Sequence, residues 1–307
     1  MEILLQQIIN GLVQGSVYAL VALGYTMVYG ILGLINFAHG EVVMIGAMLA
    51  LSALTALLGL GMPPPLALLL SILLAMAGCM ALGYGIERIA YRPLRHAPRL
   101  APLITAIGVS IVLQNLAMMV WGRGYHSFPQ LIANTPHTLG GAIINDIQII
   151  IFVMALAIMA GLMLLVHRTR LGRAMRAVAE NQHAAQLMGV DIDRVISITF
   201  MIGSALAAIA GLMVSANYGL AHYYMGFILG LKAFTAAVLG GIGNLRGAML
   251  GGLLLGLIES LGAGYIGDLT GGFLGSNYQD VFAFFVLIAV LVFRPSGLLG
   301  ERIAERA

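Results

Sequence analysis

Charged residues are scarce in this sequence of 307 residues: they make up 9% of it, whereas hydrophobic residues make up 61%. A soluble globular domain carries about 25% charged residues, so the composition excludes a soluble protein. Residues 42–86 contain no charged side chain at all. A helical membrane span needs about 20 apolar residues, so this run is long enough for two spans. We therefore predict an all-α integral membrane protein.

Cysteine and the common catalytic motifs are also rare or missing. The single cysteine, Cys79, excludes an internal disulfide, and its apolar neighbours in the sequence favour a small core residue over redox chemistry. No GxxxxGK[ST] phosphate loop and no HExxH motif occur, and the seven histidines lack metal-ligand spacing. The basic residues lie in loops between apolar runs, which argues against a nucleic-acid partner. We expect no enzymatic activity, no catalytic residue, no metal site and no cofactor in this chain.

Apolar runs separated by polar loops predict about eight transmembrane helices, give or take one. The start, MEILLQQIING, has a glutamate where a secretory signal carries a basic residue, so we expect the first span to be retained. The expected crossings are residues 3–35, 42–61, 65–86, 101–121, 147–166, 195–217, 248–266 and 280–293. The first is too long for one straight crossing and contains five glycines, which favours a discontinuous helix that lines a pathway over a strongly tilted one. Residues 227–239 are too short to cross and predict a half-span.

The distribution of basic residues predicts the orientation. Loop 87–99 holds four arginines, segment 167–194 holds five, and the end of the chain holds Arg294, Arg302 and Arg306. Together these are twelve of the fifteen Lys and Arg residues, so their side of the membrane is cytoplasmic and the C-terminus with it. The N-terminus lies outside if the half-span crosses fully, and inside if the half-span returns or if the first span crosses twice.

Segment 167–194 is the longest water-compatible stretch of the chain, and it is patterned. Leu171, Met175 and Val178 recur at helical spacing, which predicts one apolar stripe on a short basic helix. Gly189 is expected to end the helical part. A cytosolic helix between two spans needs a surface to pack against, and we interpret this one as the contact with an energising partner.

Ionisable residues near or within the spans are few, and each is unfavourable in hydrocarbon unless it is paired or faces water. Lys232 and Glu259 lie on adjacent predicted helices, where they either pair for structural reasons or line a pathway. Glu41 follows Asn36 and His39 in the stretch NFAHGE and would lie at a helix N-terminus, as a cap or as a gate. These five residues are our candidates for the translocation pathway.

Four stretches carry a family likeness. They are YALVALGYTMVYGILGLINFAHGEVVMIGA (18–47), ERIAYRPLR (87–95), KAFTAAVLGGIGNLRGAMLGG (232–252) and FRPSGLLG (293–300). Together they resemble the permease subunit of branched-chain amino-acid ABC importers, on the LivH side of the LivH/LivM pair. The resemblance covers nearly the whole chain. It implies a single permease domain over residues 1–307, in the inner membrane of a bacterium, with 167–194 as its cytoplasmic coupling segment.

The same segment is similar to the coupling loop of ABC importer permeases, whose pattern is E-A-A, three residues, then G. Ala184, Ala185 and Gly189 match, while His183 stands at the glutamate position. The residues expected to couple to an ATPase are Arg173, Ala177, Glu180, His183, Ala184, Ala185 and Gly189. The resemblance implies a related permease as heterodimer partner, two cytoplasmic ATP-binding subunits, a periplasmic solute-binding protein and contact with membrane lipid. ATP would be bound by the partner subunits.

Other readings of the sequence remain. The same architecture would carry another small solute, such as urea or a different amino acid. A self-sufficient secondary transporter or channel would need clusters of titratable residues within the spans, whereas this chain has scattered ones. An intramembrane enzyme would need a paired nucleophile and base, or metal ligands, within the spans.

Overall fold

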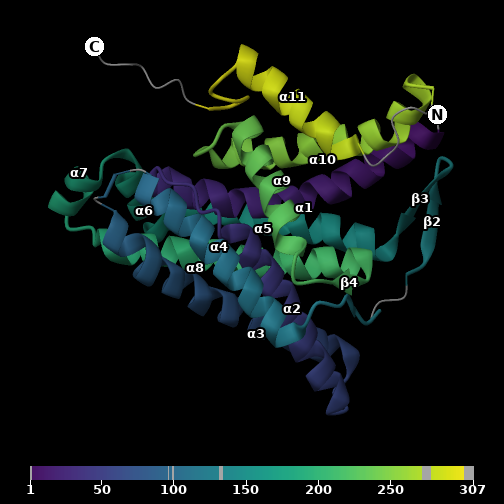
Figure 1. Cartoon of the computed structure of the whole chain (residues 1–307), viewed down its shortest axis with the longest axis horizontal. Coiled ribbons are helices and arrows are strands. Elements are labelled where there is room, and N and C mark those ends of the chain that lie inside the picture. The colour runs from purple at the N-terminus through teal and green to yellow at the C-terminus, as the bar shows by residue number, and fades with distance from the viewer. Residues whose placement is uncertain (1, 96, 99, 131–133, 272–277, 301–307) are drawn as a thin grey trace. The chain divides into compact units, whose positions relative to one another are not determined.

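The computed structural model describes residues 2–95, 97–98, 100–130, 134–271 and 278–300, and the described chain is mostly helical (Figure 1). The helices are α1 (Glu2–Leu32), α2 (His39–Gly59), α3 (Pro64–Ile86), α4 (Leu100–Trp121), α5 (Asp146–Arg168), α6 (Arg170–Glu180), α7 (Gln182–Leu187), α8 (Ile192–Tyr218), α9 (Met225–Gly240), α10 (Leu245–Leu269) and α11 (Gln279–Phe293). A π-helical turn (Glu87–Tyr91) and a 3-10 turn (Arg92–Leu94) prolong α3. Arg302 and Arg306, which are predicted to be cytoplasmic, lie outside the described residues.

Short antiparallel strand pairs connect some of the helices. Strand β1 (His126–Ser127) pairs with β4 (Leu220–Ala221), and β2 (Pro136–Leu139) pairs with β3 (Ala142–Asn145).

Helix lengths confirm the predicted fold class, an all-α multi-pass membrane protein. Within the described chain, seven helices are long and apolar enough to cross a membrane. Helix α11, at the place of the predicted eighth crossing, has 15 residues and is not among these seven, so that crossing stays a prediction. Helix α9 has 16 residues and is thus about 24 Å long, short of the roughly 30 Å hydrocarbon core. The half-span expected near residues 227–239 is therefore found.

The expected break in the first span is wrong. Helix α1 is continuous over 31 residues, and the chain leaves helical geometry only at Gly33, whose φ of 64° lies in the left-handed region. The interior glycines have another use. A Cβ on Gly11 would lie 2.8 Å from Leu257 Cα, and one on Gly15 would lie 2.8 Å from Gly252 O. These glycines admit α10 against α1, and they do not interrupt the helix.

The chain divides into two compact units. The first unit comprises Met1–Thr26, Ile132–Met159 and Lys232–Ala307, and the second comprises Met27–Leu131 and Ala160–Leu231. The single permease domain inferred from the sequence stays a prediction.

In the second unit, α2, α3 and α8 pack side by side (Figure 1). Small residues bring their backbones together: a Cβ on Gly46 would lie 2.5 Å from Ala208 Cα, and one on Gly211 would lie 2.9 Å from Ala47 N. Cys79 is fully buried beside α2, with its Sγ 3.6 Å from Val42 O. Cys79 is thus the small core residue that the sequence predicted.

In the first unit, α10 presents two glycine pairs to two different helices. Gly247 and Gly251 face α9, and Gly252 and Gly256 face α1. The sequence spacing predicted both pairs as contact faces, as is typical where helices approach closely in lipid.

We expect Gly252→Leu to destabilise the first unit. A Cβ at this position would collide with Ala19, and overpacking of this kind usually costs about 1–3 kcal/mol. The measurement is the thermal unfolding midpoint of the purified chain in one detergent. Gly108→Leu is the matched control, because Gly108 lies on an exposed face of α4 and an added Cβ would have no other atom within 4 Å. Equal midpoints for the two variants would contradict the packing role of Gly252.

Candidate functional site

Segment 167–194, which the sequence predicts to couple to an ATPase, folds as two helices, where the sequence suggested one. Asn181 has an extended backbone (φ −157°, ψ 106°) and separates α6 from α7. Its Oδ1 accepts a hydrogen bond from Ala184 N at 2.9 Å, and Thr169 Oγ1 accepts one from Gly172 N at 3.0 Å. Each helix therefore has its own N-terminal cap. Gly189, with φ of 82°, ends the helical part as predicted.

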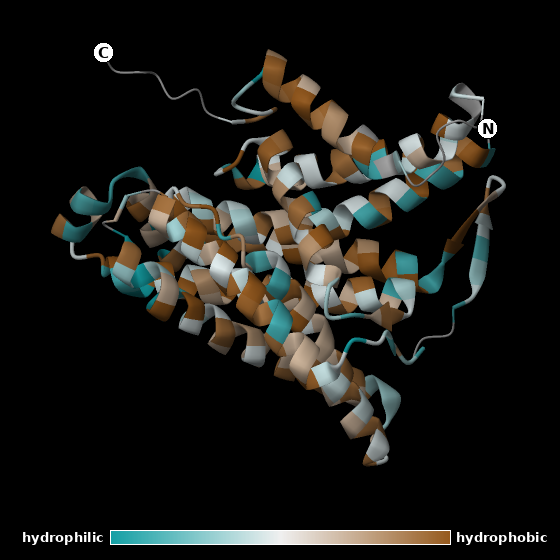
Figure 2. Ribbon diagram, viewed as in Figure 1, coloured by the Kyte–Doolittle hydropathy of each residue, from teal (hydrophilic) through white to brown (hydrophobic). Residues whose placement is uncertain are grey.

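Helix α6 has the apolar stripe that its sequence pattern indicated. Met175 and Val178 are buried, and Leu171 is half-buried. On the opposite face the three predicted coupling residues are exposed: Arg173, Ala177 and Glu180. They fall four and three residues apart, so they share one side of the helix. Hydrophilic residues are concentrated on α6 and α7 (Figure 2).

The predicted coupling residues of α7 differ in accessibility. His183, Ala184 and Gly189 are exposed, whereas Ala185 is 3% exposed and packs against its own chain. A direct partner contact thus remains a hypothesis for the first three, while Ala185 has a packing position. Sequence reasoning missed the most prominent feature of this turn, Leu187 and Met188, which are 76% and 85% exposed. The sequence did contain a signal for this exposed apolar tip, namely two large apolar residues in an otherwise polar segment.

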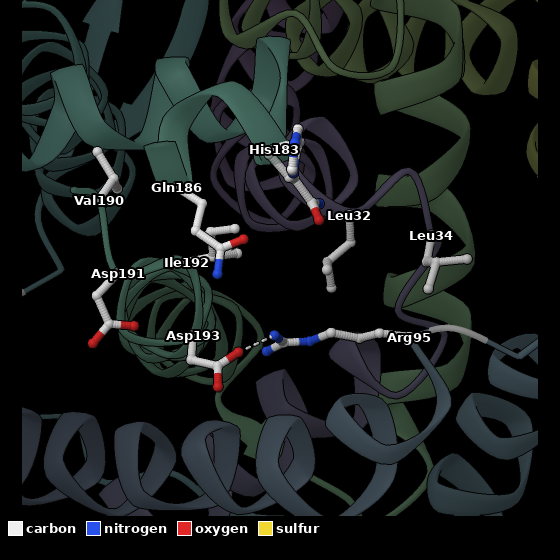
Figure 3. Close-up of a pocket in the computed structure, with 10 residues that line it drawn as sticks. Leu32, Leu34, Arg95, His183, Gln186, Val190, Asp191, Ile192 and Asp193 are labelled. Atoms are coloured by element: carbon white, nitrogen blue, oxygen red, sulfur yellow. Dashed lines mark hydrogen bonds and ion pairs between the residues drawn. The ribbon is translucent and has the colours of Figure 1, made fainter. Parts of the chain in front are cut away.

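A pocket of about 630 Å³ lies on the inner side of α7 (Figure 3). Its walls combine aliphatic, amide and charged side chains, namely Leu32, Leu34, Arg95, Gln182, His183, Gln186, Val190, Asp191, Ile192 and Asp193. Gln182 Nε2 donates a hydrogen bond to Ile31 O at 3.0 Å. This bond joins α7 to the end of α1 beside the pocket.

Glu87 organises an ion-pair network next to this pocket. Its side chain is fully buried, and its Oε2 accepts a hydrogen bond from Ser197 Oγ of α8 at 2.7 Å. Its Oε1 accepts from Arg95 Nη2 and, at 3.5 Å, from Arg92 Nε. Arg95 Nη1 also donates to Asp193 Oδ1 of α8 (Figure 3). The network ties the C-terminal end of α3 to the first turns of α8.

This network was not predicted from the sequence, where residues 87–99 were interpreted as a basic loop. The structure continues α3 into a π-helical turn at Glu87–Tyr91, a feature that often marks functional sites. The turn is also linked to the candidate pathway, since Tyr91 OH donates to Asn36 Oδ1 at 3.1 Å. A lone glutamate at the end of an apolar run was the only signal for Glu87.

The three candidate pathway residues of the NFAHGE stretch are all buried, with exposures of 4% for Asn36, 2% for His39 and 1% for Glu41. Glu41 lies in the first turn of α2, and its Oε1 accepts a hydrogen bond from Ser110 Oγ at 3.3 Å. A Cβ on Gly226 would lie 2.9 Å from Glu41 Oε2. The bare backbone of α9 thus leaves the room that this buried carboxylate occupies.

In the first unit, Lys232 and Glu259 pair as the sequence suggested, with 3.1 Å between Lys232 Nζ and Glu259 Oε2. Lys232 also contacts Asp280 Oδ1 at 2.7 Å, and Tyr18 OH donates to Glu259 Oε2 at 2.8 Å. Lys232, Glu259 and Tyr18 each lie near the middle of their helices. Paired charges at such a depth are typical of a solute pathway or of a structural clamp.

Among the residues that the structure describes, no group of three or more His, Cys, Asp or Glu side chains could hold a metal ion. Glu41 forms a hydrogen bond to another helix, and Lys232 and Glu259 form an ion pair between helices.

We expect Lys232→Met to destabilise the protein by about 3–5 kcal/mol, because it leaves Glu259 buried without its main counter-charge. The double variant Lys232→Met/Glu259→Met replaces the pair by apolar side chains and is expected to recover most of the loss. Equilibrium unfolding in a detergent series measures the free energy of unfolding of the single and the double variant. A double variant as unstable as the single one would show that pairing is not the reason.

The sequence matches the family described as branched-chain amino acid transport system / permease component over residues 7–291. It is 48% identical to the high-affinity branched-chain amino acid transport system permease protein BraD of Pseudomonas aeruginosa, over 98% of this chain and 97% of that protein. The corresponding protein LivH of Salmonella typhimurium is 44% identical over the same shares, and the ribose import permease protein RbsC of Haemophilus influenzae is 27% identical over 92% and 84%. No solved structure matches the chain. This chain therefore belongs to the family of permease components of branched-chain amino acid transport systems.

Proposed function

We propose that this chain is the transmembrane permease subunit of a binding-protein-dependent ABC importer, which moves branched-chain or related hydrophobic amino acids across the bacterial inner membrane. The observation that carries the proposal is the coupling segment. It is a capped helix pair, α6 and α7, whose exposed tip holds Leu187 and Met188. Because the sequence has no phosphate-binding motif, this tip is best explained as the docking point for a subunit that hydrolyses ATP.

The partners and cofactor follow from this role. Two cytoplasmic subunits would bind ATP and receive α6 and α7, with Arg173, Ala177, Glu180, His183, Ala184 and Gly189 on the exposed faces. A related permease would complete the transmembrane part, and a periplasmic protein would deliver the solute. The proposed substrate rests on the names of the relatives BraD and LivH.

Two clusters are the proposed pathway elements. One contains Asn36, His39 and Glu41 at the start of α2, and the other is the ion pair of Lys232 and Glu259. Both are buried polar groups in an apolar chain, and such groups in membrane helices commonly serve translocation. Transport would arise from a difference in the stability of two global states, set by ATP in the partners.

Replacing Leu187 and Met188 together by serine tests the docking point. We expect the variant to insert normally but to lose most co-purification with the ATP-binding subunits, because an apolar anchor is removed from the contact. Solute-stimulated ATP hydrolysis in reconstituted vesicles is expected to fall with it. Leu60→Ser is the matched control, since Leu60 is also 76% exposed but ends α2. Full assembly of the Leu187/Met188 variant would refute the docking role.

The orientation has its own test in intact cells, with Cys79 replaced by alanine. A cysteine introduced by Arg176→Cys in α6 is expected to react with a membrane-impermeant maleimide only after the inner membrane is opened. One introduced by Tyr125→Cys is expected to react from outside, because Tyr125 is 73% exposed in the loop that follows α4. The reverse labelling pattern would invert the proposed topology.

A further inference from the structure

Arg95 is shared between two carboxylates that differ sharply in exposure. The Glu87 side chain has no exposed surface, while the Asp193 side chain is 55% exposed. Arg92 reaches the same two groups at longer range, with 3.5 Å to Glu87 Oε1 and 3.6 Å to Asp193 Oδ2. Thus two arginines of the turns that follow α3 connect a buried acid with an accessible one.

The two ion pairs of Arg95, with Glu87 and with Asp193, differ in how easily they break. Removing the partner of a fully buried charge is strongly unfavourable, because the charge is left in a medium of low dielectric constant. The pair with Asp193 is weaker, since its carboxylate is 55% exposed and water can replace part of the lost contact, although the Arg95 side chain is only 12% exposed. The bond of Arg95 to Glu87 is therefore costly to break, whereas its bond to Asp193 opens at lower cost.

The weaker ion pair, Arg95 with Asp193, lies at the end of the coupling segment. Asp193 is in the first turn of α8, six residues after Leu187, the last residue of α7. Between α7 and Arg95 lies the pocket of about 630 Å³, which Arg95 crosses to reach Asp193 (Figure 3). The pocket gives α7 space to move toward the membrane helices. The ion pair of Arg95 with Asp193 lies at the wall of this pocket.

We propose that the contact of Arg95 and Arg92 with Asp193 is a latch that holds the coupling segment in its resting position and keeps ATP hydrolysis low until solute arrives. This inference rests on the proposed function, because it assigns positioning residues to the coupling step. The latch biases one of two arrangements of a two-state element, as such switches require. Opening leaves both arginines and Ser197 on Glu87 and releases Asp193, in the first turn of α8.

Asp193→Asn tests the latch, with Asp191→Asn as the matched control. Both variants remove one exposed negative charge from the pocket wall. Asp191 Oδ1 caps α8 by accepting a hydrogen bond from Arg194 N at 3.0 Å, and asparagine caps equally well. The importer is assembled with its partners in nanodiscs. ATP hydrolysis is measured without solute and with loaded binding protein, at low and at high salt.

We expect Asp193→Asn to raise solute-independent hydrolysis about fivefold, the equilibrium factor for an exposed ion pair of about 1 kcal/mol. Asp191→Asn is expected to match the wild type. High salt is expected to raise resting hydrolysis of the wild type and of Asp191→Asn but not of Asp193→Asn, since screening weakens an exposed pair. Asp193→Glu is expected to restore low resting hydrolysis.

Three results would overturn the latch while leaving the proposed function intact. One is resting hydrolysis of Asp193→Asn equal to that of the wild type and of Asp191→Asn. Another is the same salt response in all variants. The third is failure of Asp193→Asn to assemble, because the latch requires this pair to be dispensable for folding. A wild-type complex without solute-stimulated hydrolysis would instead refute the proposed function.

Discussion

Close helix contact in hydrocarbon depends on small residues, because lipid tails are as apolar as leucine and give helices little reason to associate. Both compact units obey this constraint. In the first, α10 meets α1 and α9 through glycines, and in the second, α2 meets α8 through Gly46 and Gly211. Dispersion contacts between backbones then replace the large interdigitating side chains of a soluble core. These contacts also position the two polar clusters, Asn36/His39/Glu41 and Lys232/Glu259, because each cluster includes residues of the packed helices α2, α9 and α10.

Buried carboxylates also connect the helices, through hydrogen bonds. Glu87, Glu41 and Glu259 are each at most 1% exposed, and each receives at least one hydrogen bond from a different helix. A carboxylate without such donors would be far less favourable in this environment. The three acids therefore fix the register between helix pairs, and they do so at the places where the chain is proposed to change state.

Much of the fold could be predicted from the sequence, because apolar length is a strong signal in membrane proteins. The half-span at α9, the stripe of Met175 and Val178, and the pair of Lys232 with Glu259 all followed from length, period or charge. The unbroken α1 did not, since the sequence shows that Gly11 and Gly15 are small but not that α10 fills the space beside them. The network of Glu87 and Asp193 was also beyond reach, because its partners lie 98 and 110 residues apart and meet only through the packing of α3 on α8.

The two glycine pairs of α10 also limit how that helix can move. Gly247 and Gly251 touch the backbone of α9, while Gly252 and Gly256 touch the backbone of α1. Turning α10 about its own axis would drive leucines of the intervening positions into two neighbouring backbones at once. A translation shared with α9 and with the stretch of α1 from Gly11 to Ala19 avoids these collisions. We therefore expect the contacting parts of these three helices to move together.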